Sequence, residues 1–235
     1  MRAILFSAGR GSRLGKLTEA VPKCLLKIGI RNMLEQWFYL FEKYGVDNVL
    51  INTHYLAEQV HNFCIKNCRG RKIKVTLTYE SELLGTAKTL YDCRDFFRGE
   101  KYFIAAFADT WMQVDLRTML KFHKKRNGLG TIGLYKPKNL SDQGVVKIED
   151  RKIVKIEEKS KTPVGEHAYA GVMIGTNGMF KFYSQNMTDL VGHWFPVIKD
   201  GLNPFFINDH VLDIGTPERY KTASEIVSGL GMKAL

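Results

Sequence analysis

The chain has 235 residues, of which 45% are hydrophobic and 25% are charged. This length and composition suit one large α/β domain or two closely fused lobes and exclude a disordered chain. Lys and Arg outnumber Asp and Glu by 35 to 24, a net charge of +11, but the basic runs at 121–125 and 69–72 are short, so we expect no nucleic-acid partner.

The first half of the chain alternates short apolar runs with amphipathic stretches. The runs predict strands at 3–6, 49–52, 75–79 and 103–107, and the stretches predict helices at 33–43, 56–67, 86–97 and 116–126. This alternation is typical of βαβ units and a mostly parallel sheet flanked by helices. Such sheets bind ligands at the carboxyl ends of their strands.

The rhythm changes at about Gly128. Four strands are predicted at 131–135, 145–149, 153–157 and 169–174, with Asp150-Arg151 as the turn of a hairpin. A helix near Met179 and a last helix from about Thr216 complete the chain. The fold class is therefore α/β, with a small antiparallel lobe attached to the parallel sheet.

Cys24, Cys64, Cys68 and Cys93 are too few for a disulfide scaffold at this length. His61, Cys64 and Cys68 share one helix face, which is typical either of a metal site or, as we prefer, of the buried face of an amphipathic helix. The apolar run at the N-terminus is too short for a signal peptide, and no run is long enough to span a membrane. We therefore expect a cytoplasmic protein without membrane insertion.

A glycine-rich loop follows the first strand. Its candidate phosphate-binding residues are Ser7, Ala8, Gly9, Gly11 and Ser12. Glycines allow a backbone to approach phosphate closely, but the Gly-Lys-Ser/Thr of a P-loop is absent, and Leu14 stands where a dinucleotide fingerprint needs glycine. Arg13 and Lys23 beside the loop supply a guanidinium fork and a compact cation for phosphate oxygens.

The stretch GRGSRLGKLTEAVPKCLL, residues 9–26, resembles the signature of the sugar nucleotidyltransferases, or nucleotide-sugar pyrophosphorylases. Lys16 stands where that family often has proline. The resemblance implies a Rossmann-like fold with an antiparallel sugar-binding lobe. It also implies a single domain with a nucleotide-binding core at 1–127, a sugar-binding lobe at 128–190 and a closing segment at 191–235.

The segment ESELLGTA, residues 80–87, resembles the base-reading segment of the family. Gly85 and Thr86 would offer backbone and hydroxyl groups to a base edge, and Glu80 could accept two hydrogen bonds from guanine, which favours GTP. The alternative is a helix N-terminus at which Glu80 and Glu82 lie favourably near the positive end.

Asp109 and Asp213 resemble the two metal ligands of the family. Asp109 ends a predicted strand and Asp213 precedes the final helix, and carboxylates at strand ends are well placed to hold Mg²⁺. We therefore expect Mg²⁺ as the cofactor.

The antiparallel lobe contains four further residues that match the family, namely Gly144, Glu158, Lys159 and Gly171. By resemblance, Glu158 binds sugar hydroxyls, Lys159 binds the sugar phosphate, and Gly171 lines the sugar. Ser160 stands where the family has proline. Without the resemblance, the charged run at 157–161 is typical of a solvated strand.

The resemblance implies that a nucleoside triphosphate and a sugar 1-phosphate, of the mannose or manno-heptose type, condense to a nucleotide-sugar and pyrophosphate. Arg13 would hold the departing pyrophosphate and Lys23 the α-phosphate. The alternatives are a UTP- or dTTP-dependent transferase, a CTP:phosphocholine cytidylyltransferase, and a sensor that binds nucleotide-sugar without catalysis. Which base, which sugar and which oligomeric state apply is not readable from the sequence.

Overall fold

The computed structural model describes residues 1–231, so the predicted closing segment extends past the described part. The chain forms two compact units. Unit 1 comprises Met1–Leu83, Ala106–Gln113 and the segment from Asp209, and unit 2 comprises Leu84–Ala105 and Val114–Asn208. The division at 127 and 190 stays a prediction.

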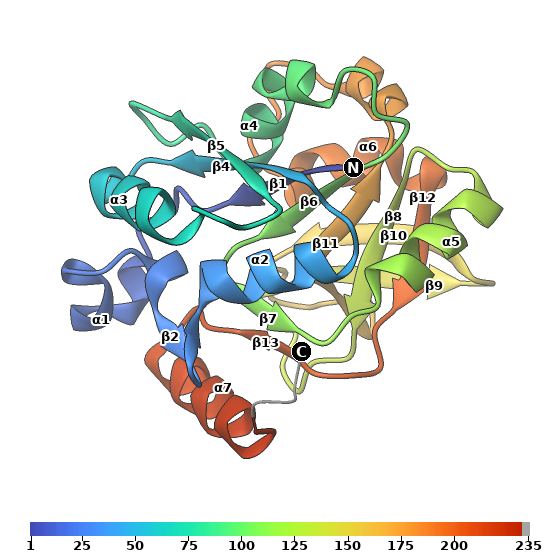
Figure 1. Cartoon of the computed structure of the whole chain (residues 1–235). Helices are drawn as coiled ribbons and strands as arrows, with labels where there is room; N and C mark the ends of the chain where they lie inside the picture. Colours follow the sequence, from blue (N-terminus) through green and yellow to red (C-terminus); the bar gives the residue numbers. More distant parts are fainter. Residues whose placement is uncertain (232–235) are drawn as a thin grey trace. The chain divides into compact units, whose positions relative to one another are not determined.

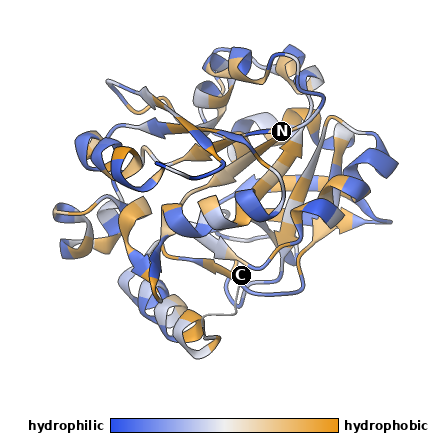
Figure 2. Ribbon diagram, viewed as in Figure 1, coloured by the Kyte–Doolittle hydropathy of each residue, from blue (hydrophilic) through white to orange (hydrophobic). Residues whose placement is uncertain are grey.

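Unit 1 contains three of the four strands predicted from the first half of the chain, and they pair in parallel. β1 (Arg2–Phe6) pairs with β4 (Asn48–Thr53), which pairs with β5 (Lys74–Tyr79). The apolar residues of β1 are buried and appear in hydrophobic colours in Figure 2, as a strand covered on both faces requires. The connections run through α2 (Met33–Lys43) and α3 (Ala57–Asn67) (Figure 1). The α/β class is thus confirmed.

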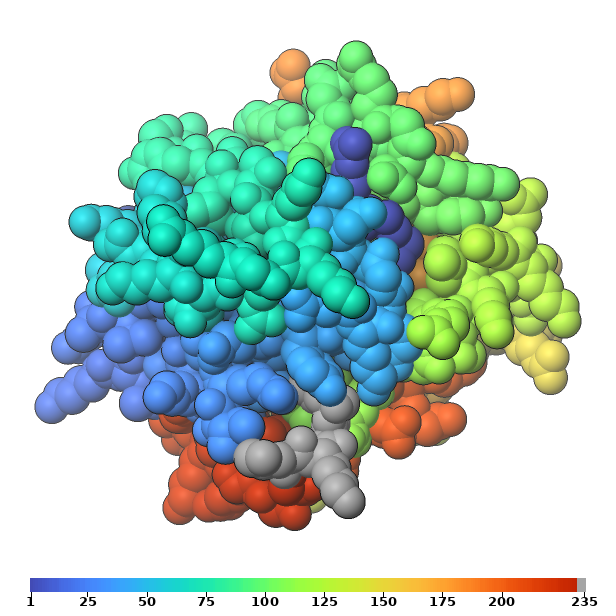
Figure 3. Space-filling view, in the orientation of Figure 1, coloured from blue at the N-terminus to red at the C-terminus, as the bar shows by residue number. Residues whose placement is uncertain are grey.

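Two small antiparallel sheets in unit 1 were not predicted from the sequence. β2 (Lys27–Ile28) pairs with β3 (Arg31–Asn32), and β7 (Thr110–Met112) pairs with β13 (Val211–Asp213). Their length of two or three residues is too short for a hydrophobic period. The last helix, α7 (Pro217–Gly229), buries Ala223 and Val227 and lies at the surface, in red in Figure 3.

Unit 2 contains the predicted antiparallel strands. β8 (Gly130–Tyr135) and β9 (Gly144–Glu149) both pair antiparallel with β11 (His167–Gly175), and β9 also pairs with β10 (Lys152–Glu158). The hairpin turn lies at Asp150 and Arg151, as predicted. A fifth strand, β12 (Leu202–Phe206), was not predicted and pairs parallel with β8.

The predicted helix at 86–97 is wrong in its second half. α4 (Thr86–Asp92) stops before Cys93, and a 3-10 turn (Arg94–Phe97) follows. The turn directs Phe97 into the core, where it stacks on Phe103 and Phe180. The stretch near Met179 is likewise a 3-10 helix (Asn177–Phe182).

The remaining helices of unit 2 differ in length. α5 (Leu116–Arg126) has the predicted bounds and is capped by Asp115, whose carboxylate accepts from the N–H groups of Arg117 and Thr118. A π-helical turn (Leu190–Trp194) leads into α6 (Phe195–Ile198). Over residues 1–231, no helix is both long and apolar enough to cross a membrane.

Candidate active site

Ser7, the first residue after β1, is tied to the end of the neighbouring strand β4. Its N–H donates to Oδ1 of Asn52 at 2.8 Å, and its hydroxyl donates to the Asn52 carbonyl at 2.5 Å. Asn52 in turn donates through Nδ2 to Oε1 of Glu80 at 2.8 Å. Asn52 and Glu80 are 4% and 5% exposed. Glu80, predicted to read the base, therefore also anchors the start of the loop through Asn52.

Gly11 shapes the second half of the loop. Its backbone is left-handed, with a φ of 66°, and a side chain there would meet Cγ2 of Thr18 at 3.0 Å. The Gly11 carbonyl accepts from the Thr18 hydroxyl at 2.9 Å and from the Leu14 N–H at 2.8 Å. Leu14, which stands where a dinucleotide fingerprint has glycine, is buried in the core of unit 1.

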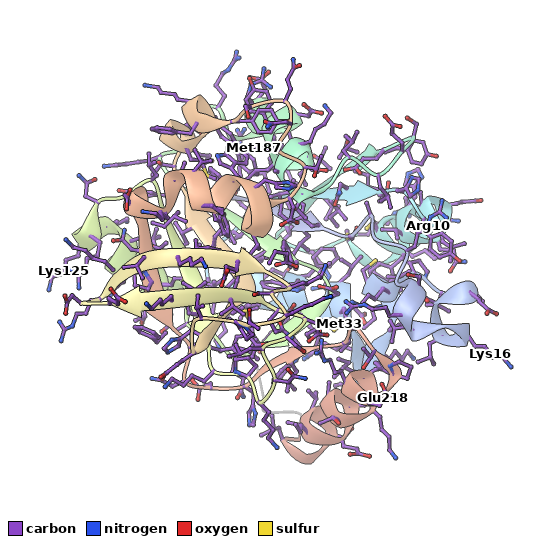
Figure 4. The ribbon with its side chains drawn as sticks, turned by 180° about the vertical axis from the view of Figure 1, so that it is seen from behind. Arg10, Lys16, Met33, Lys125, Met187 and Glu218 are labelled. Atoms are coloured by element: carbon purple, nitrogen blue, oxygen red, sulfur yellow. The ribbon has the colours of Figure 1, made fainter. Side chains whose placement is uncertain are left out.

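The loop leads into a 3-10 turn (Ser12–Leu14) and a one-turn helix, α1 (Lys16–Glu19), rather than a long helix. Ser12 and Gly9 are exposed, whereas Ala8 is buried. Figure 4 shows Arg10 and Lys16 projecting outward, while Met33 lies in the interior. Phosphate binding here would therefore depend on loop N–H groups and cations and not on a helix dipole.

Lys23 lies between the two aspartates that were predicted to bind metal. Its Nζ is 2.5 Å from Oδ2 of Asp109 and 3.9 Å from Oδ1 of Asp213. Lys23 follows Pro22 at the start of a 3-10 turn (Lys23–Leu25), and its side chain is 11% exposed. The structure thus brings together three residues that are far apart in the sequence.

Backbone pairing holds the two aspartates side by side. Asp109 follows β6 (Phe103–Phe107), and Asp213 is the last residue of β13, opposite Thr110 in β7. The Ile214 N–H donates to the Asp109 carbonyl at 3.2 Å, and the Ala108 N–H donates to the Phe6 carbonyl at 3.1 Å. The pair therefore lies at the carboxyl end of β1, beside the glycine-rich loop.

Two arginines complete this cluster. Nη1 of Arg219, in α7, is 2.7 Å from Oδ2 of Asp213. Arg13 reaches the same place from the loop. Its Nη2 and both carboxylate oxygens of Asp213 lie 3.0 to 3.1 Å from the point where a Cβ on Gly215 would sit. A side chain at position 215 would crowd both charged groups.

The cluster combines three cations, Lys23, Arg13 and Arg219, with two carboxylates. Positive charge in excess of negative charge suits a polyphosphate ligand.

Neighbouring Cys24 is no nucleophile, because burial raises the pKa of its thiol to about 12. Among residues 1–231 there is no group of three or more His, Cys, Asp and Glu side chains arranged for a metal ion. A metal site would therefore depend on Asp109 and Asp213 as a pair.

Gly85 and Thr86, in unit 2, make close contacts with the segment before the π-helical turn. A Cβ at Gly85 would lie 2.2 Å from the carbonyl oxygen of Thr188, and the Gly85 φ is 83°. The Thr86 hydroxyl donates to Oδ2 of Asp189 at 3.0 Å and accepts from the Leu190 N–H at 2.9 Å. These two residues thus hold the loop around Asp189, and base reading by them stays a prediction.

Gly144, Glu158 and Lys159 lie together at one end of the β9–β10 hairpin, since Gly144 pairs with Glu158. A Cβ at Gly144 would be 2.9 Å from Oε2 of Glu158. Lys159 has a left-handed φ of 50°, and its Nζ is 3.3 Å from Oε1 of Glu158. Gly171, with a φ of 78°, interrupts the pairing of β11.

Sequence reasoning missed Asn52, Thr18, Asp189, Gly215 and Arg219. Asn52 follows an apolar run at the end of a predicted strand. Asp109 was singled out because a polar residue at a strand's carboxyl end is well placed to bind a ligand, and the same reasoning applies to Asn52. Arg219 and Gly215 flank the Thr-Pro start of the last helix. Asp189 carries no such signal, because its partner Thr86 is 103 positions away. Thr18 carries none because its hydroxyl bonds to backbone carbonyls of the loop, those of Gly11 and Gly15.

A profile of the family described as "Nucleotidyl transferase" matches residues 2–228. Mannose-1-phosphate guanylyltransferase 1 of Arabidopsis thaliana is 31% identical over 229 residues, which cover 94% of this chain and 63% of the relative. The catalytic subunit beta of the same enzyme from Danio rerio is 28% identical, again over 94% of this chain and 63% of the relative. The chain thus spans less than two thirds of the length of these relatives.

Solved structures share the fold at lower sequence identity. A putative glucose-1-phosphate thymidylyltransferase from Bacillus anthracis superposes with a TM-score of 0.88 at 22% identity, covering 97% of this chain and 95% of that chain. HddC from Yersinia pseudotuberculosis gives a TM-score of 0.81 at 21% identity, and the match covers 96% of this chain and 98% of HddC. The family match over residues 2–228 confirms the resemblance in residues 9–26, and the chain belongs to the nucleotidyl transferase family.

Proposed function

We propose that this protein condenses a nucleoside triphosphate, with GTP favoured, and a sugar 1-phosphate of the mannose or manno-heptose type. A phosphate oxygen of the sugar 1-phosphate attacks the α-phosphorus of the triphosphate. The bond from the α-phosphorus to the β-phosphate oxygen breaks, and pyrophosphate leaves with the electron pair. The cluster around Lys23 carries this proposal.

The attacking phosphate is already an anion, so the reaction needs no strong base. Its obstacle is the repulsion between two polyanions, which cations and positioning overcome. Lys23 would stabilise the charge that builds on the α-phosphate, and Arg13 would hold the departing pyrophosphate. In unit 2, Glu158 and Lys159 would bind the sugar hydroxyls and the sugar phosphate, and their shared position at one end of the β9–β10 hairpin supports this assignment.

Asp109 and Asp213 fit Mg²⁺ by the chemistry of their oxygen atoms. Carboxylates are the hard donors that Mg²⁺ takes from proteins, together with substrate phosphates. Both aspartates already lie within 4 Å of one ammonium group, so their oxygens face a common point. Held there, Mg²⁺ would offset phosphate charge.

The preference for GTP and mannose-type sugars draws on the relatives named mannose-1-phosphate guanylyltransferase. HddC from Yersinia pseudotuberculosis, which shares the fold, is solved in complex with GMP-PN. We propose that Glu80 accepts hydrogen bonds from guanine. The Nδ2 group of Asn52 donates to Oε1 of Glu80 and so fixes the position of this carboxylate. The cytoplasmic location stays a prediction.

Pyrophosphate release tests the proposal. The protein is incubated with Mg²⁺ and each nucleoside triphosphate in turn. The acceptors are mannose 1-phosphate, manno-heptose 1-phosphate, glucose 1-phosphate and phosphocholine. We expect the highest kcat/KM with GTP and a mannose-type acceptor. Release with UTP, dTTP or CTP but not GTP would refute the base assignment, and nucleotide-sugar binding without release in any pair would point to a sensor.

A further inference from the structure

A cavity of about 640 Å³ in unit 2 is assigned no role by the proposed reaction. It lies along β12, all five residues of which contribute to its wall, and is bounded by the end of α5 and the start of β10. Its volume falls within the range of about 300–1,000 Å³ that small-molecule sites occupy.

The cavity is distinct from the proposed sugar end of unit 2. Arg151 and Lys152 line it at the beginning of β10, whereas Glu158 ends the same strand. Six residue steps at about 3.3 Å each separate Lys152 from Glu158 by about 20 Å. One sugar phosphate cannot reach both ends.

The wall of the cavity is strongly basic. Arg126 ends α5, Arg151 and Lys152 come from the β9–β10 hairpin, and Lys199 precedes β12. Among the described residues that line it, Asp200 is the only acid, and its carboxylate lies 2.7 Å from Nζ of Lys199. Two guanidinium forks from different elements therefore face a shared space, an arrangement that favours phosphate oxygens.

One side of the cavity is aromatic. Phe122 of α5 and Phe205 of β12 pack edge to face with their ring centroids 5.5 Å apart. The guanidinium of Arg126 lies 5.5 Å from the Phe122 centroid, over the ring. Aromatic faces next to cations bind a planar base and its phosphates together.

Arg151 occupies its position at a backbone cost. The turn residues Asp150 and Arg151 have φ values of 49° and 61°, where glycine or asparagine is the usual choice. A bulky residue held in this conformation costs about 1 kcal/mol or more and is typical of functional sites. An arginine in this conformation is explained if position 151 is occupied for its guanidinium group and not for the shape of the turn.

From the cavity, its cations and its aromatic side, we infer that unit 2 binds a nucleoside phosphate at a second site, apart from the reaction. The phosphates contact Arg126 and Arg151, and the base lies against Phe122 and Phe205. The second site does not depend on the base or sugar that the catalytic site takes; only the expectation that GDP also occupies the catalytic site rests on the proposed function.

Calorimetric titration of the full-length protein with GDP, in parallel with inorganic pyrophosphate, tests the inference. We expect two GDP sites per chain. Arg151→Gly should weaken one of them at least tenfold and leave turnover at low nucleotide unchanged, since it removes a bidentate phosphate contact. Glycine tolerates a positive φ, so this variant should melt no lower than the wild type.

Two matched variants sharpen the test. Asp150→Gly relieves the same turn but retains the guanidinium, and Lys125→Gln removes a cation that projects outward from α5 (Figure 4). Both should keep two GDP sites. A wild-type protein without a GDP site that Arg151→Gly weakens, or equal loss in Arg151→Gly and Asp150→Gly, would overturn the inference. A single GDP site that Arg151→Gly weakens would instead refute GDP binding at the catalytic site. Pyrophosphate binding as tight as that of GDP would overturn the role of the aromatic side.

Discussion

The ammonium group of Lys23 lies 2.5 Å from a carboxylate oxygen of Asp109, although 86 positions separate the two residues. The contact places the Lys23 ammonium group at the carboxyl end of β1, where the glycine-rich loop begins. A lysine in such a position is paired before substrate binds and can exchange its carboxylate partner for a phosphate oxygen.

Lys23→Met should therefore abolish most of the turnover while the fold persists. Removing one preorganised donor to a transition-state oxygen typically costs about 10² to 10³ in kcat. The measurement is pyrophosphate release with GTP and mannose 1-phosphate, with circular dichroism as the check on folding. Lys16→Met, on the exposed surface of α1, is the control and should retain full activity. A fully active Lys23→Met would remove Lys23 from the chemistry.

Chelation of divalent metal should stop turnover, and added Mg²⁺ should restore it. Asp213→Asn should raise the half-saturating Mg²⁺ concentration, since an amide is a weaker ligand than a carboxylate. Arg219→Gln should lower that concentration, because Nη1 of Arg219 lies 2.7 Å from Oδ2 of Asp213 and competes for it. Identical Mg²⁺ dependence in all three proteins would contradict the assignment of Asp213.

Glu80→Gln separates two roles of one buried side chain. The glutamine carbonyl oxygen can still accept from Nδ2 of Asn52, so the free energy of unfolding should change by less than about 1 kcal/mol. If the carboxylate also accepts from guanine, kcat/KM for GTP should fall about tenfold while that for UTP stays low, since each charged hydrogen bond contributes about 1.5–3 kcal/mol.

Asn52→Ala is the matched variant for the structural role. It removes the Asn52 donor to Oε1 of Glu80 and the Asn52 acceptor of the Ser7 N–H, so unfolding should become easier by about 1–3 kcal/mol, as measured by urea denaturation. Equal destabilisation by Glu80→Gln and Asn52→Ala would mean that the Glu80 charge itself is structural.

Many of the helices and strands could be predicted because hydrophobic periodicity and the family motif are encoded within short stretches of sequence. The bounds of α2 and α5 and the turn at Asp150-Arg151 follow from patterns within a dozen residues. Asp109 was predicted from its place at the carboxyl end of a strand, whereas Asp213 and the role of Lys23 were predicted from the family resemblance.

The missed features depend on contacts that no local pattern encodes. Asp189 accepts from Thr86, which is 103 positions away. The β7–β13 sheet that aligns the aspartates is three residues long, below the length at which alternation is visible. The break in the predicted helix at 86–97 arises because Phe97 packs on Phe103, a tertiary contact that overrides helix propensity.

Two glycines should respond differently to alanine. Gly215→Ala crowds the movable side chains of Arg13 and Asp213, at 3.0 Å from the new Cβ, so turnover should fall while the melting temperature holds. Gly85→Ala places a Cβ 2.2 Å from the backbone oxygen of Thr188 at a positive φ. It should destabilise the fold by about 1–3 kcal/mol in urea denaturation. A stable Gly85→Ala would show that the Thr188 backbone moves easily.

His123 should make the fold sensitive to mild acid. It is 1% exposed, its Nδ1 lies 2.8 Å from the hydroxyl oxygen of Thr131, and burial lowers its pKa. The neutral ring is thus favoured in the folded state, while the unfolded chain takes up a proton at a pKa of about 6.5. The contribution of the neutral ring is therefore fully present above about pH 6.5 and is lost as the pH falls below it, with a slope of at most about 1.4 kcal/mol per pH unit.

Urea denaturation at pH 7.5 and pH 5.0 measures this loss. His123→Asn retains an acceptor for the Thr131 hydroxyl and does not titrate, so its stability should fall less between the two pH values than that of the wild type. His61 lies on the exposed face of α3 and not on the buried face that the sequence predicted, and the stability of His61→Asn should fall as that of the wild type does. If His123→Asn and the wild type lose equal stability on acidification, the acid sensitivity arises from other groups and His123 titrates alike in the folded and unfolded chain.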